Sequence, residues 1–339
     1  MRIFLLPFAV LFWILTEIRN FLYDKSFLKS HKVDVPVLCV GNLTTGGTGK
    51  TPWVQYICKY LEGKSKKVVI VSRGYGGEYE GVLKVSSEMD PKLCGDEPLW
   101  LSKNTKATVY LCKDRTLGAR TAIKEVKPDV ILLDDGFQHR KLHRDFNLVL
   151  LDASAKKNSY WMLPVGNLRE AFSGVKRATA VIINKCNYAD PKDVQRISLE
   201  CRKYIDDSSV WKADFLFEEW KPLFDGSHQS FKNSNISICC GLGNPQAFVK
   251  TVEGQNFNPV GKFIFPDHFY WKPSDVEKMA HEMRKLDSYD LMVTEKDAVK
   301  LDRYKKHFLE MNIQLWVCEM KVEVSSNKDI LFNEIDKIL

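Results

Sequence analysis

The first residues of the chain form an apolar stretch, with no charged residue between positions 3 and 15. Continued as a helix, this segment has one apolar stripe, formed by Leu11, Ile14, Leu15, Ile18 and Leu22. Glu17, Arg19 and Asn20 take the other side. A helix that spans a bilayer needs about 20 apolar residues, so the stretch is too short to cross on its own, and residues 16–19 do not form a signal-peptide cleavage site. The pattern therefore favours a membrane-associated helix over residues 1–24, and the alternative is a helix that only packs on the protein body.

Beyond this helix, short apolar runs alternate with segments whose apolar residues recur at helical spacing. Strands are expected at residues 35–40, 68–71, 109–111, 130–133, 148–151 and 180–183, and helices near residues 54–61 and 119–126. Alternating strands and helices predict an α/β fold built on a mostly parallel sheet, with ligands at the carboxyl ends of the strands.

A passage resembling a linker, residues 220–226, divides the chain into two predicted domains, 25–225 and 226–339. Residues 236–240, 260–265, 291–293 and 313–317 are expected to form the strands of the second, smaller α/β domain, with helices near 248–252 and after Pro273.

A glycine-rich loop follows the first expected strand. Residues 41–51 read Gly-Asn-Leu-Thr-Thr-Gly-Gly-Thr-Gly-Lys-Thr, and a helical pattern with Pro52 near its first turn comes next. Backbone N–H groups of such a loop bind phosphates, so we expect Lys50 to reach the β and γ phosphates of a nucleotide and Thr51 to bind Mg²⁺. The predicted nucleotide-binding residues of the loop are Thr44, Thr45, Gly46, Gly47, Thr48, Gly49, Lys50 and Thr51. Thr44 occupies the place of the usual first glycine, and a plain tight turn is the alternative.

An acidic pair ends the expected strand at residues 130–133. Asp134 and Asp135 come directly after four apolar residues. Carboxylates at the carboxyl end of a strand beside a phosphate-binding loop can hold Mg²⁺ across from the loop hydroxyl. We predict that Asp134 is the metal ligand, with Asp135 as the second choice. The alternative is that the two acids only open a turn.

Composition adds a preference for anionic partners and a reducing compartment. The 339 residues carry a formal net charge of +7, which favours nucleotides, phosphorylated substrates or acidic lipid headgroups. The nine cysteines include no Cys-x-x-Cys pair, a pattern typical of reduced thiols in the cytosol. We predict no nucleic-acid partner and no required protein partner.

Several further motifs occur in the order found in one enzyme family. They are Gly-Asp-Glu-Pro at 95–98, Asp-Asp-Gly-Phe-Gln-His at 134–139, Leu-Pro-Val-Gly-Asn-Leu-Arg-Glu at 163–170, Phe-Pro-Asp-His at 265–268 and Thr-Glu-Lys-Asp at 294–297. With the glycine loop, they make the chain resemble the tetraacyldisaccharide 4'-kinases of lipid A synthesis over nearly its whole length. The resemblance implies a P-loop kinase that uses ATP and Mg²⁺ to phosphorylate the 4'-hydroxyl of tetraacyldisaccharide 1-phosphate, giving lipid IVA. It also implies a peripheral or monotopic position at the cytoplasmic face of the bacterial inner membrane, in contact with its lipids.

The resemblance also suggests roles for individual side chains. An acidic turn that faces the phosphates suits a general base, and Asp96 is the candidate, with His268 from the second domain as its partner. Lys50 and Asp135 complete the predicted catalytic set. The residues expected to stabilise substrate or phosphate are Arg73, Glu97, Arg115, Arg169 and Lys296, and Gln138 is expected near the nucleotide. Each cation could instead be an ordinary surface charge.

Two other classes of protein remain alternatives. A regulatory or metal-delivery ATPase would carry an extra lysine before the Gly-Gly pair, where this chain has Thr45. A membrane-bound nucleotide sensor would have no activity to lose on substitution of Asp96. Residues 184–187, Asn-Lys-Cys-Asn, resemble a guanine-reading loop, but Asn187 replaces its carboxylate and GTP is not predicted.

Overall fold

The computed structural model describes residues 3–224, 230–231, 234–242, 245–267 and 269–339, and its strands form one long sheet. The strands are β1 (Val37–Asn42), β2 (Val68–Ser72), β3 (Val82–Lys84), β4 (Thr108–Cys112), β5 (Val130–Asp134), β6 (Phe146–Asp152), β7 (Ala180–Asn184), β8 (Val210–Pro222), β9 (Ile236–Cys240), β10 (Gly261–Ile264), β11 (Asp290–Thr294) and β12 (Gln314–Val324). The helices are α1 (Leu6–Asp24), α2 (Lys50–Gly63), α3 (Pro91–Cys94), α4 (Asp96–Asn104), α5 (Arg115–Val126), α6 (Pro191–Cys201), α7 (Pro245–Glu253), α8 (Pro273–Lys285), α9 (Glu295–Leu301), α10 (Lys305–Glu310) and α11 (Lys328–Asp336). The order of strands across the sheet is β10-β9-β11-β12-β8-β7-β6-β1-β5-β2-β4-β3.

The N-terminal half of the sheet is built around β1. This strand lies between β5 and β6 and is parallel to both, and β2, β4 and β7 continue the parallel arrangement on either side. These strands are buried along almost their whole length because helices cover the sheet, which explains why they appear in the sequence as continuous apolar runs. The predicted α/β class with a mostly parallel sheet is confirmed.

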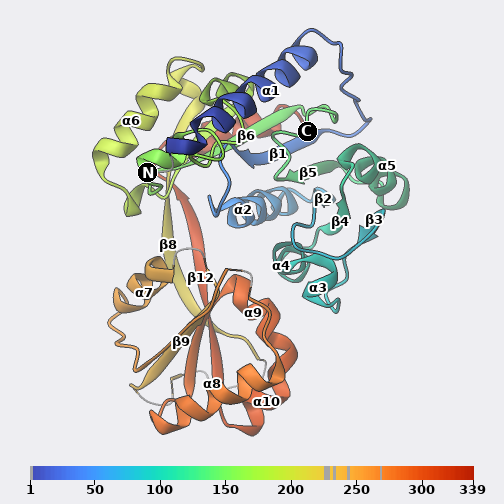
Figure 1. Ribbon diagram of the computed structural model, residues 1–339. Helices are drawn as coiled ribbons and strands as arrows, with labels where there is room; N and C mark the ends of the chain where they lie inside the picture. The colour runs from blue at the N-terminus through green and yellow to red at the C-terminus, as the bar shows by residue number, and fades with distance from the viewer. Residues whose placement is uncertain (1–2, 225–229, 232–233, 243–244, 268) are drawn as a thin grey trace.

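The C-terminal half repeats the arrangement on a smaller scale, with β9, β10 and β11 parallel and β12 parallel to β11. Figure 1 shows two lobes joined by β8 and β12. These strands pair antiparallel from Ala213 opposite Val324 to Pro222 opposite Trp316. The expectation of a linker at residues 220–226 was wrong for residues 220–222, which end β8, and residues 225 and 226 lie outside the described part.

The end of the chain returns to the N-terminal lobe. The ring of Phe332 on α11 lies 3.9 Å from that of Tyr60 on α2, centroid to centroid, and Tyr60 donates a hydrogen bond to Asp336. Division of the chain into domains at residue 225 stays a prediction, and α11 packs against the lobe that precedes that boundary.

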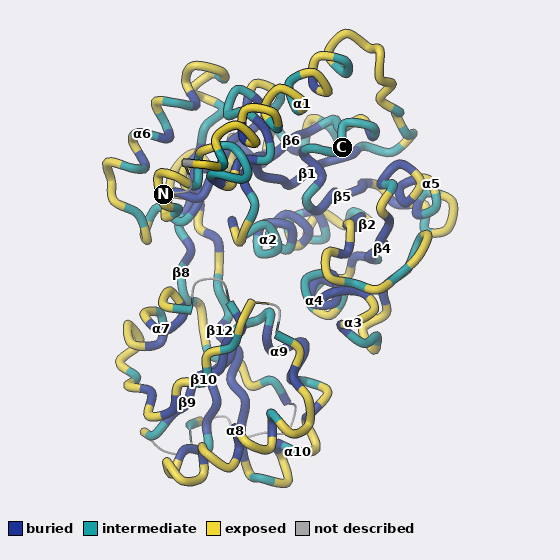
Figure 2. The backbone as a smooth tube through the Cα atoms, in the orientation of Figure 1, coloured by how far each residue is buried: buried dark blue, intermediate teal, exposed yellow. Residues whose placement is uncertain are grey.

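Helix α1 turns its large apolar side chains outward. Ala9 and Asn20 are buried against the protein body, whereas Phe8, Leu11 and Leu15 are more than half exposed. Figure 2 shows this helix exposed along most of its length. By length and composition the helix could also cross a membrane, so the expectation that the segment is too short does not hold on that criterion.

The predicted acidic turn at residues 95–98 is the beginning of helix α4. Gly95 is the N-cap of α4, and Asp96 and Glu97 occupy its first turn. Pro98 lies within that turn, where a proline is tolerated because no intrahelical N–H bond is needed. The carboxylates are therefore held at a helix N-terminus, which favours negative charge.

Candidate active site

The glycine loop connects β1 to α2, as the sequence predicted. Gly46 and Gly49 have φ angles of +105° and +84°, a backbone region that residues other than glycine rarely adopt. A Cβ atom on Gly46 or Gly47 would meet nothing within 4 Å, so the backbone at these two positions borders open space. Gly49 is the N-cap of α2, and Lys50 is its first residue. This is the geometry in which backbone N–H groups bind phosphate.

Thr44 has a structural role that explains the missing glycine. It is buried and pairs antiparallel with Leu168, while the N–H of Thr45 donates to the carbonyl of Asn167 at 2.8 Å. The N–H of Arg169 donates to the carbonyl of Leu43 at 2.8 Å. A β-branched residue suits this extended pairing, which brings residues 167–169 alongside the loop.

Two asparagines and a lysine hold the loop from the other side. Asn42 Nδ2 donates to Thr48 Oγ1 at 2.8 Å, and Asn184 Nδ2 donates to the Thr48 carbonyl at 2.8 Å. Lys185 Nζ donates to the Gly47 carbonyl at 2.6 Å. Asn184 and Lys185 of the segment that resembles a guanine-reading loop thus support the backbone of the phosphate loop. Asn187 bonds to the backbone of Phe215 instead.

The two adjacent aspartates at the end of β5 have opposite electrostatic surroundings. Burial, with the charges of Glu97 and Asp135, raises the pKa of Asp134 to about 7. Burial also raises the pKa of Asp135, but Lys50 and Arg169 outweigh it and hold that pKa below its ordinary value. Arg169 lies 2.9 Å from Asp135 Oδ1, and Lys50 Nζ lies 3.9 Å from Asp135 Oδ2. Asp135 is therefore an ion-paired carboxylate, whereas Asp134 binds its proton more tightly than an ordinary aspartate.

Asp134 has the free oxygen that a metal ligand needs. Ser72 Oγ donates to Asp134 Oδ2 at 2.8 Å, whereas the buried Oδ1 has no hydrogen-bond partner among the described residues. Thr51, the predicted second ligand, is half-buried in the first turn of α2. An orphaned buried carboxylate oxygen opposite a phosphate loop fits a hard cation such as Mg²⁺.

Gln138 and Arg169 belong to a network that reaches α1. Gln138 Nε2 donates to Glu170 Oε1 at 2.9 Å and to the Asn42 carbonyl at 2.9 Å. Arg169 donates to Gln138 Oε1 at 3.4 Å, and Asn20 on α1 donates to Glu170 Oε2 at 3.1 Å. Arg177 pairs with the same Glu170 oxygen at 2.6 Å. The phosphate loop and the N-terminal helix thus share one buried polar network.

The remaining predicted groups fall into two places. Arg115 is buried beside the acidic pair and donates to the Asp135 carbonyl at 3.4 Å, and burial and the charge of exposed Arg73 lower the pKa of Arg115. Glu97 acts on Asp134 through its charge, so the start of α4 faces the end of β5. Arg115 and Glu97 thus lie around the acidic pair at the end of β5.

Asp96 contacts the C-terminal lobe, to which Lys296 itself belongs. Asp96 Oδ2 lies 3.2 Å from Lys300 Nζ on α9, and Lys296 Nζ lies 2.7 Å from Asp267 Oδ1. His268, the predicted partner of Asp96, lies outside the described residues. The roles of all these side chains stay predictions.

Sequence reasoning missed four residues of this site: Ser72, Asn184, Glu170 and Lys300. Glu170 is the last residue of the motif at 163–170, and Lys300 follows Lys296 by one helical turn. Their burial would have been visible only with the fold, because isolated charged residues in sequence usually indicate surface positions.

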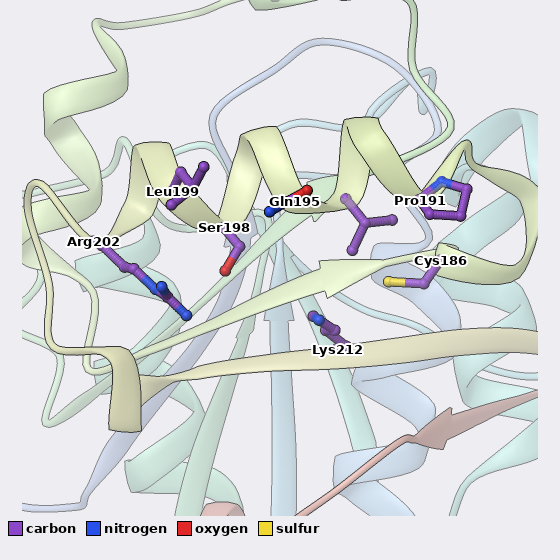
Figure 3. Close-up of a pocket in the computed structure, with 8 residues that line it drawn as sticks. Cys186, Pro191, Gln195, Ser198, Leu199, Arg202 and Lys212 are labelled. Atoms are coloured by element: carbon purple, nitrogen blue, oxygen red, sulfur yellow. The ribbon is translucent and has the colours of Figure 1, made fainter.

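A groove below α6 is separate from the phosphate loop. Its volume is about 520 Å³, and it is lined by Cys186, Gln195, Ser198, Arg202 and Lys212, among others (Figure 3). Arg202 is already paired with Asp207 at 2.7 Å. None of the predicted site residues lines this groove.

Comparison with known proteins gives consistent matches over the full length. The family model described as LpxK, tetraacyldisaccharide-1-P 4'-kinase, matches residues 1–339. The tetraacyldisaccharide 4'-kinase of Cytophaga hutchinsonii is 32% identical over 99% of this chain and 95% of its own length. That of Bdellovibrio bacteriovorus is 31% identical over the full length of both chains. The crystal structure of LpxK from Aquifex aeolicus in complex with ATP has a TM-score of 0.78 and 31% identity, covering 99% of each chain.

Proposed function

The chain belongs to the family of tetraacyldisaccharide-1-P 4'-kinases, and we propose that its glycine loop and the groups around it carry out the family reaction. In that reaction the γ-phosphoryl group of ATP passes to the 4'-hydroxyl of tetraacyldisaccharide 1-phosphate. The product is the 1,4'-bisphosphorylated lipid A precursor. The observation that carries the proposal is the arrangement of Lys50, Asp134, Asp135 and Arg169 at the open phosphate loop.

Binding of ATP falls to the loop and its cations. The N–H groups near Gly46 and Gly47 and the ammonium of Lys50 hold the β and γ phosphates. Arg169 and Arg115 stand at the acidic pair, where they offset the charge that spreads over the transferring phosphoryl oxygens. Asp135 keeps Lys50 and Arg169 in place before the nucleotide binds.

Asp134 and Thr51 are the residues that would hold Mg²⁺. When bound, the ion supplies charge neutralisation between the β and γ phosphates. The orphaned Asp134 Oδ1 supports this assignment. Because the pKa of Asp134 is raised to about 7, its proton must leave before the carboxylate binds a cation, so affinity for the ion should fall below neutral pH.

Asp96 is the proposed base for the attacking hydroxyl. It opens α4, whose next residue, Glu97, faces Asp134, so its position is close to the phosphate end of the site. A carboxylate there can accept the proton of the 4'-hydroxyl as the new ester bond forms. We propose that Lys296, Arg73 and Glu97 contact the sugar phosphate.

The N-terminal helix is the proposed contact with the membrane that holds the substrate. The large apolar side chains of α1 are exposed, and its polar side is bonded to the body through Asn20 and Arg19. Such a helix lies in the bilayer surface with its outer face among the acyl chains. We place the enzyme on the cytoplasmic face of the inner membrane, where ATP is available.

Transfer of labelled γ-phosphate from ATP to tetraacyldisaccharide 1-phosphate in mixed detergent micelles tests the proposal. We expect labelled lipid with the wild-type enzyme and a loss of at least about a hundredfold with Lys50→Ala, because the transferring phosphate loses its cation. A matched control is Lys59→Ala, in the same helix α2 but outside the loop. Phosphate released only to water, or equal lipid labelling by Lys50→Ala and wild type, would contradict the proposal.

A further inference from the structure

A buried lysine crosses from the C-terminal lobe to the candidate base. Lys300 on α9 is only 2% exposed. Its Nζ lies 3.2 Å from Asp96 Oδ2 on α4 and 3.5 Å from Asp297 Oδ1 on its own helix. It also lies 4.8 Å from the centre of the Trp271 ring. The ammonium is therefore enclosed by two carboxylates and an aromatic face.

A positive charge as deeply buried as the Lys300 ammonium needs negative groups nearby. Lysine is almost never fully buried unless paired, because removing an ammonium from water is strongly unfavourable. Lys300 Nζ makes no hydrogen bond of good geometry within the described residues, so its compensation comes from the nearby charges and the ring. The ionised Asp96 carboxylate is the nearer of the two negative charges that offset this ammonium.

The second carboxylate is fixed by the C-terminal lobe. Asp297 Oδ2 accepts hydrogen bonds from Thr294 Oγ1 at 2.6 Å and from the Gly241 N–H at 3.0 Å. Asp297 is fully buried, so it cannot move toward Asp96 without losing both bonds. Asp297 therefore fixes one side of the Lys300 ammonium, and the Asp96 carboxylate lies on another side of it.

We propose that Lys300 is a positioning residue for phosphoryl transfer, whose ammonium holds the Asp96 carboxylate ionised and in place across the junction of α4 and α9. This inference rests on the proposed role of Asp96 as base. It makes the catalytic group depend on both lobes, since Asp96 comes from one and its counter-charge from the other. A nearby cation favours the ionised form of a carboxyl, which is the form that accepts a proton.

Lys300→Met removes the charge and keeps most of the side-chain volume. We expect the acid limb of the pH profile of kcat/KM to move to higher pH by about one to three units, because Asp96 protonates more readily. At pH 7 the kcat for the lipid acceptor should fall at least about tenfold, while KM for ATP stays within about twofold, because the phosphate loop is untouched. Lys300→Arg keeps the charge and should restore the acid limb.

Lys103→Met is the matched control. Lys103 also lies on α4 and also pairs with the C-terminal lobe, 2.5 Å from Asp302 Oδ2, but this pair is about a third exposed, and Lys103 lies at the opposite end of the helix from Asp96. Its loss should leave kcat and the pH profile unchanged. A purely structural cation at position 300 would instead lower stability and leave the position of the acid limb where it is.

A double-mutant cycle separates this inference from the proposed function. If Lys300 acts through Asp96, Lys300→Met should cost little residual kcat in an Asp96→Asn background. An undiminished cost there, or a wild-type pH profile in Lys300→Met, would overturn the inference while Asp96 remains the base. If Asp96→Asn itself has wild-type kcat, the base assignment fails first, and the inference fails with it.

Discussion

Replacing either aspartate at the end of β5 should change the pH dependence of stability, with opposite signs. Asp134 binds its proton more tightly in the folded chain, because its pKa is raised to about 7 by burial and neighbouring acids. Its presence therefore makes the metal-free protein less stable as pH rises from about 4 to about 7. Asp135 has a lowered pKa, so its stabilisation is present above its ordinary pKa of about 4 and is lost as pH falls below that value.

The size of the first effect follows from the pKa. A tenfold change in proton affinity corresponds to about 1.4 kcal/mol, so a rise from 3.8 to about 7 costs at most about 4 kcal/mol of unfolding free energy at high pH. Asp134→Asn removes this cost and keeps an acceptor for Ser72. It should therefore gain stability over wild type as pH rises toward 8, although it loses the proposed metal ligand.

Urea denaturation in EDTA between pH 4.5 and 8 measures both variants. The difference between Asp134→Asn and wild type should grow in favour of the variant with rising pH. Asp135→Asn serves as the matched variant and should be less stable than wild type over the same range, because Lys50 and Arg169 lose their counter-charge. Differences that stay constant with pH for Asp134→Asn, or stabilisation by Asp135→Asn, would refute this electrostatic account.

Three further changes test other parts of the structure. Gly49→Ala places a Cβ 2.9 Å from Asn184 Nδ2 at a φ of +84°. The variant should lose about 1–2 kcal/mol of stability and bind a fluorescent ATP analogue weakly. The control Gly63→Ala, whose Cβ meets nothing within 4 Å, should bind the analogue normally. Glu170→Leu leaves the half-buried Arg177 without its carboxylate and should cost about 3–5 kcal/mol in urea denaturation. A midpoint equal to that of Glu200→Leu would count against the network. The double variant Leu11→Asp, Leu15→Asp should lower co-sedimentation with anionic phospholipid vesicles at least about tenfold. Leu309, which is exposed on α10, provides the control, and an equal loss with Leu309→Asp would show that α1 is not the membrane contact.

The parts of the site that sequence could predict are those made by neighbouring residues. The glycine loop, the aspartate pair and the flanking strand and helix each lie within about a dozen residues, and their apolar runs match the buried strands β1 and β5. The exact ends of the strands shifted by one or two residues, as with β1, because terminal pairing depends on neighbours in space.

The parts that sequence could not predict depend on distant pairs. Thr44 is paired with Leu168, and Lys300 is buried because α9 meets α4, contacts that no local pattern records. Strand β8 was not predicted at all, and β12 was predicted only over residues 313–317, because charged residues interrupt their apolar patterns where they cross between the lobes. The start of α4 looked like a turn because Gly95 and Pro98 flank the acids, although both residues are common at helix starts.

Phosphorus–proton correlation NMR of the purified lipid product is the most direct test of the central claim, that this site phosphorylates the 4'-hydroxyl. Wild-type enzyme with ATP and tetraacyldisaccharide 1-phosphate should give one new phosphomonoester whose phosphorus couples to the proton at carbon 4', in addition to the phosphate at carbon 1. Product from Asp96→Asn should be reduced at least about a hundredfold if that carboxylate is the base. A new phosphate on another hydroxyl, or inorganic phosphate with no modified lipid, would contradict the account.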